Sequence, residues 1–191
     1  EFLEKTLRSI LMNDLRGVQI IVSDGGSTDQ THQILDHYVD LFDVVISEPD
    51  EGQSDAINKG FEKANGKILC WLNGDDVFEL KVLRKILSTK EEICVPYKVK
   101  PSYAAEDMKV KIENGLVVSI GKDLKKYISG ESVGVRVFRN EGVDILKRSL
   151  EKEIRTEKFN KKWYASAISR ILKRGHKISS IDIGDLYWHD V

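Results

Sequence analysis

Two carboxylate-rich turns hold the side chains of this sequence that are best suited to chemistry. The first is Asp24-Gly-Gly-Ser-Thr-Asp29, and the second, Asn73-Gly-Asp-Asp76, ends in the adjacent acids Asp75 and Asp76. Two neighbouring carboxylates repel each other unless a cation neutralises them, and their hard oxygen atoms suit Mg²⁺ or Mn²⁺, which also bridge to substrate phosphates. Either turn alone is also compatible with an ordinary solvated loop. Together they predict a site for a divalent metal and a diphosphate.

An apolar run precedes each turn and predicts the strand that positions it. Residues 19–23 and 68–72 are short and rich in aliphatic side chains, as in buried parallel strands. Gly25-Gly26 interrupts the first run where a chain would leave a sheet, and Ser27 or Thr28 is suited to cap the helix that follows. Because open α/β sheets bind ligands at the carboxyl ends of their strands, we expect both turns at one rim of a sheet.

The composition is typical of a globular domain of ordinary size. The chain has 191 residues, of which 41% are hydrophobic and 32% charged, and we expect one domain over residues 1–191. No apolar stretch approaches the length of a membrane span. Cys70 and Cys94 lie in apolar runs without metal-ligand spacing, so we expect buried thiols and a cytoplasmic location.

The net charge of −1 hides an asymmetry between the two halves of the chain. Residues 1–80 contain 6 basic and 16 acidic residues, whereas residues 81–191 contain 24 basic and 15 acidic residues. The acidic half carries the two turns and is expected to bind the nucleotide and the metal. The basic half is expected on the acceptor side, where it would hold phosphates or an acidic acceptor. Aromatic residues do not alternate with the basic ones, so we expect no nucleic-acid partner.

Hydrophobic periodicity predicts an α/β fold with a mixed, mostly parallel sheet flanked by helices. The chain opens with a helical stripe over residues 1–13, whereas doubly wound domains normally open with a strand, so we expect that a first strand is missing. Asn65-Gly66 is the expected C-cap of the third helix, and Glu113-Asn-Gly115 is the expected turn of a hairpin. Further helices are expected over residues 30–41, 56–66, 80–87, 141–155 and 162–174, and strands over 18–23, 42–47, 68–72, 93–99, 108–112, 116–120, 130–138 and 177–183.

Three motifs resemble the signature of glycosyltransferase family 2, whose members are inverting enzymes of the GT-A fold. They are Asp24-Gly-Gly-Ser-Thr-Asp29, the segment 47–60 and Trp71-Leu-Asn-Gly-Asp-Asp76, and the resemblance covers residues 1 to about 80. It implies that Asp24 contacts the base or ribose of a nucleotide-sugar donor, and that Asp75 and Asp76 hold the metal at the diphosphate. The other donor-site residues that it implies are Gly25, Ser27, Asp55, Asn58 and Lys59. The opening strand of the family, with its Pro-Thr/Ser-Tyr-Asn-like loop, is not in this sequence.

Later segments carry a second resemblance, to the C-terminal half of sugar-phosphate and alcohol-phosphate nucleotidyltransferases. It covers residues from about 76 to 191 and rests on residues 106–111, 120–124, 130–135, 163–168 and 182–191. It implies that Asp190 is a further metal ligand beside Asp75 and Asp76, and that Lys122 and Glu131 face a phosphate acceptor. The Gly-rich, Arg-bearing triphosphate loop of that family is not found. The chain therefore resembles a hybrid within the nucleotide-diphospho-sugar transferase superfamily.

Three functions remain open from the sequence. The first is metal-dependent transfer of a sugar from a nucleotide-diphosphate sugar to an acceptor hydroxyl, with Asp107, in the pair Glu106-Asp107, or Glu131 as the catalytic base. The second is nucleotidyl transfer from a nucleoside triphosphate to a sugar or alcohol phosphate at the same Mg²⁺ or Mn²⁺. The third is a nucleotide-binding or chimeric domain without turnover, because half-sites from two families need not meet in a working geometry.

Overall fold

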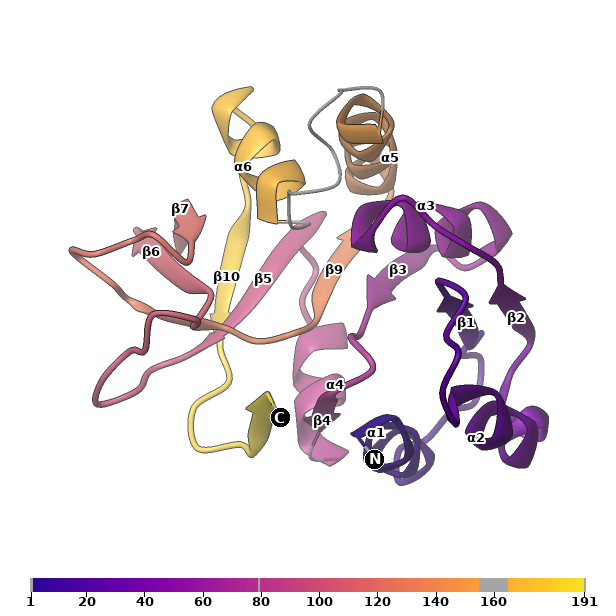
Figure 1. Cartoon of the computed structure of the whole chain (residues 1–191). Helices are drawn as coiled ribbons and strands as arrows, with labels where there is room; N and C mark the ends of the chain where they lie inside the picture. Colours follow the sequence, from indigo (N-terminus) through magenta and orange to yellow (C-terminus); the bar gives the residue numbers. More distant parts are fainter. Residues whose placement is uncertain (1, 79, 155–164, 191) are drawn as a thin grey trace.

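The computed structural model describes residues 2–78, 80–154 and 165–190, which form helices packed on β-sheets (Figure 1). The start of the helix expected over 162–174 lies outside these ranges. The helices are α1 (Phe2–Leu11), α2 (Thr31–His37), the 3₁₀ helix η1 (Val39–Leu41), α3 (Gln53–Lys63), α4 (Leu80–Leu87), α5 (Glu141–Ile154) and α6 (Ala165–Lys173). The strands are β1 (Ile21–Asp24), β2 (Val44–Ser47), β3 (Ile68–Trp71), β4 (Asp76–Phe78), β5 (Ile93–Lys98), β6 (Lys109–Glu113), β7 (Leu116–Gly121), β8 (Gly130–Ser132), β9 (Arg136–Arg139), β10 (Ser179–Asp182) and β11 (Trp188–Asp190).

The main sheet has seven strands in the order β10-β7-β6-β8-β5-β9-β3. β5 also pairs in parallel with β10, so β10, β7, β6, β8 and β5 close into a ring of hydrogen-bonded strands. Two further pairs stand apart from this sheet: β1 with β2 in parallel, and β4 with β11 in antiparallel orientation. In the part of the chain that the structure describes, β1 and β3 each have one edge without a hydrogen-bonded strand. The expected missing first strand stays a prediction.

The mixed α/β architecture is confirmed, but the expectation of a mostly parallel sheet is wrong. Only β1–β2 and β5–β10 are parallel among the described pairings, and the others are antiparallel. One cause is the hairpin β6–β7, which is antiparallel by construction. Its turn is the predicted one, with positive φ at Asn114 (51°) and Gly115 (76°). The other cause is β9, which runs antiparallel between β3 and β5.

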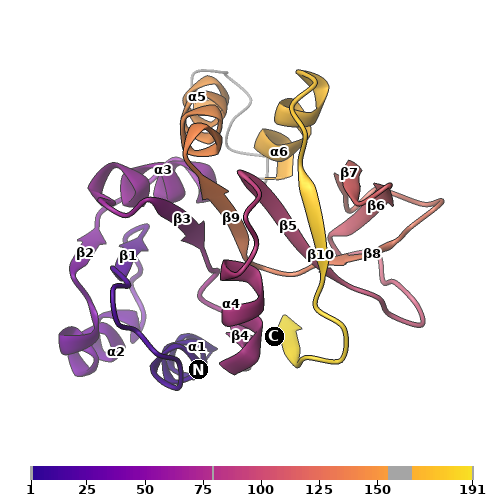
Figure 2. The same cartoon turned by 180° about the vertical axis from the view of Figure 1, so that it is seen from behind.

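Helices cover both faces of the main sheet and define two cores. α3, α5 and α6 lie over one face, and α4 lies over the other (Figures 1 and 2). Alternate strand residues enter alternate cores: Phe138 of β9 packs under α5 and α6, whereas its neighbour Val137 packs with Val82 and Ile86 of α4. This period of two is the expected behaviour of a strand that is buried on both faces. Within the described ranges, no helix is both long and apolar enough to cross a membrane.

Three local predictions are wrong. α2 begins at Thr31 with Gln30 at its N-cap and has no side-chain cap, so neither Ser27 nor Thr28 caps it, and the Ser27 hydroxyl donates to Asp24. α3 begins at Gln53 and ends at Lys63 with an extended Ala64 after it, so Asn65-Gly66 does not cap it. Cys70 is exposed because β3 is the last strand of the main sheet and its alternate residues face outward. Cys94 is buried as expected, and burial raises the pKa of its thiol to about 11.

Candidate functional site

The Asp24 carboxylate ends β1 and is held by donors from two turns. It is 8% exposed and accepts hydrogen bonds from the Ser47 hydroxyl (2.9 Å), from the Ser27 hydroxyl and from the Ser27 backbone N–H (3.2 Å to Oδ2). Burial acts to raise the pKa of Asp24, but these donors outweigh burial and hold the pKa below its ordinary value. The predicted residues Asp24 and Ser27 therefore form one fixed, ionised hydrogen-bond acceptor.

Gly25 allows a second loop to approach this turn closely. A Cβ at position 25 would overlap the carboxylate of Asp50, so the Asp50 side chain would have to move. Asp50 in turn accepts a hydrogen bond from the backbone N–H of Gly52 (2.8 Å), which holds the loop in shape before α3 begins at Gln53. Gly25 thus has a steric reason for its identity.

Lys59 closes the loop that leads into α3. Its Nζ lies 3.0 Å from Glu48 Oε1, 3.3 Å from Asp55 Oδ2 and 2.8 Å from the backbone oxygen of Pro49. The hydrogen bond to Glu48 is the main cause that raises the pKa of Lys59. The predicted residues Asp55 and Lys59 are therefore brought together, in a network that shapes this loop.

Asn58 is directed away from this network. Its Nδ2 donates to Glu62 Oε1 (3.1 Å), one turn further along α3. Among the residues that the structure describes, this is the side-chain hydrogen bond that Asn58 makes. The structure therefore gives no contact between Asn58 and the Asp24 turn.

The second turn packs between α1 and α3. The Thr6 hydroxyl donates to the Gly74 backbone oxygen (2.9 Å), and Gln53 Nε2 donates to Asn73 Oδ1 (2.9 Å). Gln53 directly follows the loop that carries Asp50, which lies against Gly25. Both carboxylate-rich turns thus contact the same short segment, residues 50–53. These contacts bring the two halves of the predicted donor site to one region.

Asp76 is directed into the protein, whereas Asp75 is partly exposed. Asp76 is 1% exposed, its Oδ1 accepts a hydrogen bond from Trp188 Nε1 (3.3 Å), and a Cβ on Gly134 would overlap its carboxylate. Asp190 of β11 pairs in register with Asp76 of β4. Asp76 therefore ties β4 to β11 and to the segment after β8, and Asp75 is the acid of the pair that solvent reaches.

The acids of the second turn are the candidate ligands for a divalent metal. The structure, over the residues that it describes, contains no cluster of three or more His, Cys, Asp or Glu side chains arranged for a metal ion. Mg²⁺ commonly binds one or two carboxylates and completes its shell with waters and substrate phosphates. Asp75 and Asp76 are adjacent carboxylates, but the Asp76 carboxylate lies against Gly134 and Trp188, whereas Asp75 is partly exposed. Of the two, Asp75 is therefore the acid that can reach a Mg²⁺ or Mn²⁺ arriving with a diphosphate.

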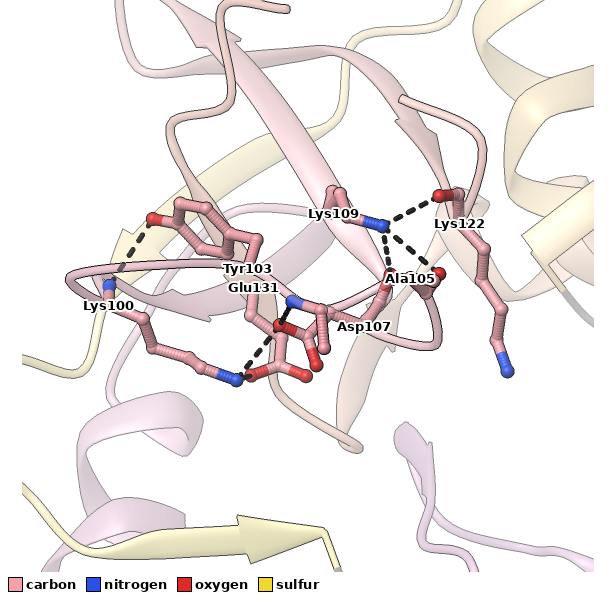
Figure 3. A network of polar contacts seen from close by, with 8 residues as sticks. Lys100, Tyr103, Ala105, Asp107, Lys109, Lys122 and Glu131 are labelled. Atoms are coloured by element: carbon pink, nitrogen blue, oxygen red, sulfur yellow. Dashed lines mark hydrogen bonds and ion pairs between the residues drawn. The ribbon is translucent and has the colours of Figure 1, made fainter. Parts of the chain in front are cut away.

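A second group of acids, Asp107 and Glu131, gathers around Lys100 (Figure 3). Lys100 Nζ lies 2.9 Å from Asp107 Oδ2 and 2.8 Å from Glu131 Oε2. Burial raises the pKa of Glu131, and Lys100 offsets this only in part. Burial also acts to raise the pKa of Asp107, but Lys100 and the Ala104 N–H (2.9 Å) outweigh it and lower the pKa. The two predicted base candidates are thus neighbours with different proton affinities.

Lys109 fixes the backbone on both sides of this acid network. Its Nζ is buried and donates to the backbone oxygens of Lys122 (2.7 Å), Ala105 (3.2 Å) and Asp107 (3.2 Å). The predicted residue Lys122 is therefore joined to the Asp107 loop through its backbone. Its side chain extends away from the Lys109 ammonium (Figure 3).

Several residues that organise the site do not stand out in the sequence as candidates. They are Gln53, Lys100, Lys109 and Gly134. Lys100 carried no distinguishing signal among 30 lysine and arginine residues, and Lys109 lies in the 106–111 segment without a predicted role. Gln53 lies inside the 47–60 motif, and its side chain became informative only when the structure placed it against Asn73. The need for glycine at position 134 is set by the Asp76 carboxylate, which lies far away in sequence but packs against it.

The chain matches a known family model over more than half of its length. Residues 1–109 match the model described as Glycosyl transferase family 2. The match thus extends beyond residue 80, where the motifs alone placed the end of this resemblance. It includes both carboxylate-rich turns and the loop with Lys100 and Asp107, but ends before Glu131.

Curated relatives agree with this assignment. The chain is 38% identical over 77 residues to the uncharacterized glycosyltransferase Rv1514c of Mycobacterium tuberculosis, which covers 40% of this chain and 29% of that protein. It is 27% identical over 173 residues to the GalNAc(5)-diNAcBac-PP-undecaprenol beta-1,3-glucosyltransferase of Campylobacter jejuni, which covers 86% of this chain and 52% of that enzyme. The chain thus spans about half or less of the length of these relatives.

The fold as a whole resembles that of the inositol-1-phosphate CTP transferase from T. maritima. The two structures superpose with a TM-score of 0.74 over 99% of this chain and 76% of the other, at 17% sequence identity. At this identity the likeness establishes the fold alone. It supports the nucleotide-diphospho-sugar transferase-like architecture expected from the sequence.

Proposed function

The chain belongs to glycosyltransferase family 2, and from this premise we propose that it transfers a sugar from a nucleotide-diphosphate sugar to an acceptor hydroxyl with the help of Mg²⁺ or Mn²⁺. One observation carries the proposal most strongly. The Asp24 turn and the Asn73–Asp76 turn both contact the segment 50–53, so that a single donor can reach both. A cytoplasmic location and the absence of a nucleic-acid partner belong to the same proposal.

The donor nucleotide is assigned to the Asp24 turn. Asp24 remains ionised and is held by Ser27 and Ser47, so its carboxylate can accept hydrogen bonds from ribose hydroxyls or a base. Gly25 keeps the Asp50 loop close to the nucleotide. The proposed donor side also includes Asp55, Asn58 and Lys59. The ion pair between Asp55 and Lys59 shapes the loop before α3.

The metal is assigned to the pair Asp75 and Asp76, with Asp190 as the third acid. When bound, it would neutralise the negative charge that develops on the leaving diphosphate. The protein's own contribution is to hold the pair in place. Thr6 and Gln53 fix the turn from either side, and Trp188 with Gly134 fixes Asp76.

Glu131 is the proposed proton acceptor on the acceptor side. Its raised pKa makes it the stronger base of the network, whereas Asp107 has a lowered pKa and stays ionised. In the proposed step the acceptor hydroxyl gives its proton to a Glu131 carboxylate oxygen as the hydroxyl oxygen bonds to the sugar carbon. The bond between that carbon and the diphosphate oxygen breaks in the same step. Lys122 lies at the edge of this network and is proposed to contact the acceptor.

Nucleotidyl transfer is the second candidate. The observation in its favour is the likeness of fold to the inositol-1-phosphate CTP transferase over nearly the whole chain. In that case the acceptor phosphate would lie near Lys122 and Glu131, and CTP would replace the sugar nucleotide. The sequence contains no Gly-rich, Arg-bearing triphosphate loop, which ranks this function below glycosyl transfer.

A ligand panel separates the candidate functions. The melting temperature would be measured with UDP-glucose, GDP-mannose, CDP-glucose, UDP and CTP, each with and without Mn²⁺. The Campylobacter relative, by its name a glucosyltransferase, makes UDP-glucose the first donor to test. Stabilisation by a sugar nucleotide that depends on Mn²⁺ supports glycosyl transfer. Stabilisation by CTP alone supports nucleotidyl transfer, and no stabilisation by any ligand supports a domain without turnover.

Two variants show whether a stabilising ligand uses the proposed site. Asp24→Asn should abolish the shift caused by the nucleotide, and Asp75→Asn should abolish only its dependence on Mn²⁺. Asp36→Asn is the matched control, since Asp36 is an exposed acid of α2. An unchanged shift in Asp24→Asn would place the nucleotide elsewhere.

A further inference from the structure

Lys100 follows β5 closely and reaches two carboxylates that are almost buried. Its side chain is 35% exposed, whereas the side chains of Asp107 and Glu131 are 9% and 5% exposed. The Lys100 backbone N–H donates to the Tyr103 hydroxyl (3.2 Å), which folds the loop after β5 back toward the acids. Lys100 is thus the most accessible member of a compact charged group (Figure 3).

The group carries two acids and one ammonium, so one negative charge is in excess. Burial and a neighbouring like charge both disfavour ionisation of a carboxyl group. Asp107 has a second donor, the Ala104 N–H, on the oxygen that also receives Lys100. Glu131 receives Lys100 on its carboxylate, and its other polar neighbour in this group is the Asp107 carboxyl, which acts to raise the pKa of Glu131. Ionisation of Glu131 therefore depends on Lys100 more than ionisation of Asp107 does.

Other charged groups nearby are engaged with backbone atoms. Lys109 donates to the backbone oxygens of Ala105, Asp107 and Lys122, and Lys98 of β5 donates to the backbone oxygen of Leu186 (2.9 Å). The Tyr103 hydroxyl accepts the Lys100 N–H. Among the described residues, Lys100 is the cation whose ammonium contacts the Glu131 carboxylate.

We infer that Lys100 is a positioning residue, whose ammonium holds the Glu131 carboxylate ionised and oriented toward the acceptor hydroxyl. The inference rests on the proposed function, in which Glu131 receives the acceptor proton. That proton moves from the hydroxyl to Glu131, and Lys100 keeps its own protons throughout. Lys100 does not touch the sugar carbon or the diphosphate in this scheme.

The test compares Lys100→Met and Lys100→Arg with the parent protein. Turnover of the sugar nucleotide that stabilises the protein would be followed as a function of pH. In Lys100→Met, the acid limb of the kcat profile should move to higher pH by about 1 to 3 units. Turnover at neutral pH should fall roughly tenfold or more, with KM for the donor unchanged. Lys100→Arg should restore most of the activity, because a guanidinium can also contact both acids. An acid limb that does not move in Lys100→Met overturns the inference.

A titration separates failure of this inference from failure of the proposed function. Carboxyl-¹³C glutamate labelling reports the protonation of Glu131 directly, with Glu131→Gln to assign its signal. The titration midpoint of Glu131 should rise in Lys100→Met and stay near the parent value in Lys100→Arg. An unchanged midpoint overturns the inference even if no donor is ever turned over. If the titration midpoint of Glu131 rises in Lys100→Met but the parent protein turns over no donor, the proposed function is overturned. The effect of Lys100 on the ionisation of Glu131 then still stands.

Controls address folding and charge. Lys111→Met removes a lysine that pairs with Glu113 on the neighbouring hairpin, and it should change neither the profile nor the midpoint. Circular dichroism would show whether Lys100→Met is folded. Lys100→Gln, which keeps a hydrogen-bond donor without the charge, gives a second test under the same criteria if Lys100→Met is unfolded.

Discussion

Asp24 and Glu131 are both nearly buried carboxylates at strand positions, yet their surroundings move their pKa values in opposite directions. Asp24 is 8% exposed and Glu131 is 4% exposed. Asp24 receives hydroxyl and backbone donors from two turns, and its pKa is lowered. Glu131 shares one ammonium with Asp107, and its pKa is raised. Burial disfavours the ionised form of both acids; the donors around Asp24 outweigh it, whereas Lys100 offsets it only in part at Glu131.

This difference assigns different tasks to the two regions. A carboxylate with a lowered pKa stays charged at neutral pH and serves as a permanent acceptor for ligand hydroxyls. A carboxyl group with a raised pKa binds a proton more readily than an ordinary carboxylate does. The region of Asp24 is therefore built for binding, and the region of Glu131 for proton transfer. The predictions below test this division.

The largest effect is expected for Glu131→Gln. The amide keeps the size of the side chain but cannot accept a proton, so turnover should fall by roughly 10²- to 10⁴-fold. The nucleotide-induced rise in melting temperature should persist, because Asp24 is unchanged. Steady-state kinetics and the ligand panel measure both quantities. Glu113→Gln, an exposed acid paired with Lys111, is the matched control. Full activity in Glu131→Gln would show that Glu131 is not the proton acceptor.

Lys109→Met should weaken the fold on the acceptor side. The variant leaves three backbone oxygens without their shared donor, and the free energy of unfolding should fall by roughly 1 to 3 kcal/mol. Lys111→Met, which loses a partly exposed ion pair and a contact with the exposed Tyr127 ring, should change it by less than about 1 kcal/mol. Urea unfolding measures both variants. Equal losses would show that the Lys109 ammonium has no special role.

Gly25→Ala should disturb the donor side. The new Cβ would displace the Asp50 carboxylate and the loop before α3, with a cost of about 1 kcal/mol in unfolding free energy and weaker nucleotide binding. Gly60→Ala is the control, because its nearest neighbour is Ile21 Cγ2 at 3.9 Å and alanine is favoured inside α3. It should be neutral or stabilising. Calorimetry and nucleotide titration distinguish the two.

The smallest effect is expected for Ser47→Ala and depends on pH. Ser47 stabilises the ionised form of Asp24, so its loss should cost about 1 kcal/mol at pH 7. Because the folded-state pKa of Asp24 is lowered, this stabilisation is fully present above the unfolded pKa of about 3.9 and disappears as pH falls through the folded-state pKa. Unfolding free energies at pH 7, 4 and 3 would show the difference shrinking.

Ser88→Ala provides the pH-independent comparison for Ser47→Ala. The Ser88 hydroxyl donates to the Lys85 backbone oxygen, which does not titrate. Its effect should therefore be the same at each pH. A Ser47→Ala effect that also stays constant would mean that the hydroxyl does not act through the charge of Asp24.

Local patterns predicted many elements because short-range physics dictates them. The apolar run before Asp24 and the Asn114-Gly115 turn appear where expected, since strand burial and positive φ leave direct marks in the sequence. The direction in which the strands pair was not predictable from such local patterns. β9 enters between β3 and β5 in antiparallel orientation, and the strand pair β4–β11 joins residues more than a hundred positions apart. Nothing within a window of ten residues specifies such a partner.

The sequence by itself determined the family, the acidic turns and the residue types available for donor and metal. It also supplied Glu131 and Asp107 as base candidates. Only the tertiary structure decided which of them is the stronger base, because that depends on burial and on Lys100, which approaches from another strand. It also decided that Asp76 faces inward toward Trp188 while Asp75 remains accessible. Side-chain chemistry is local, but desolvation and charge pairing arise only when distant segments meet.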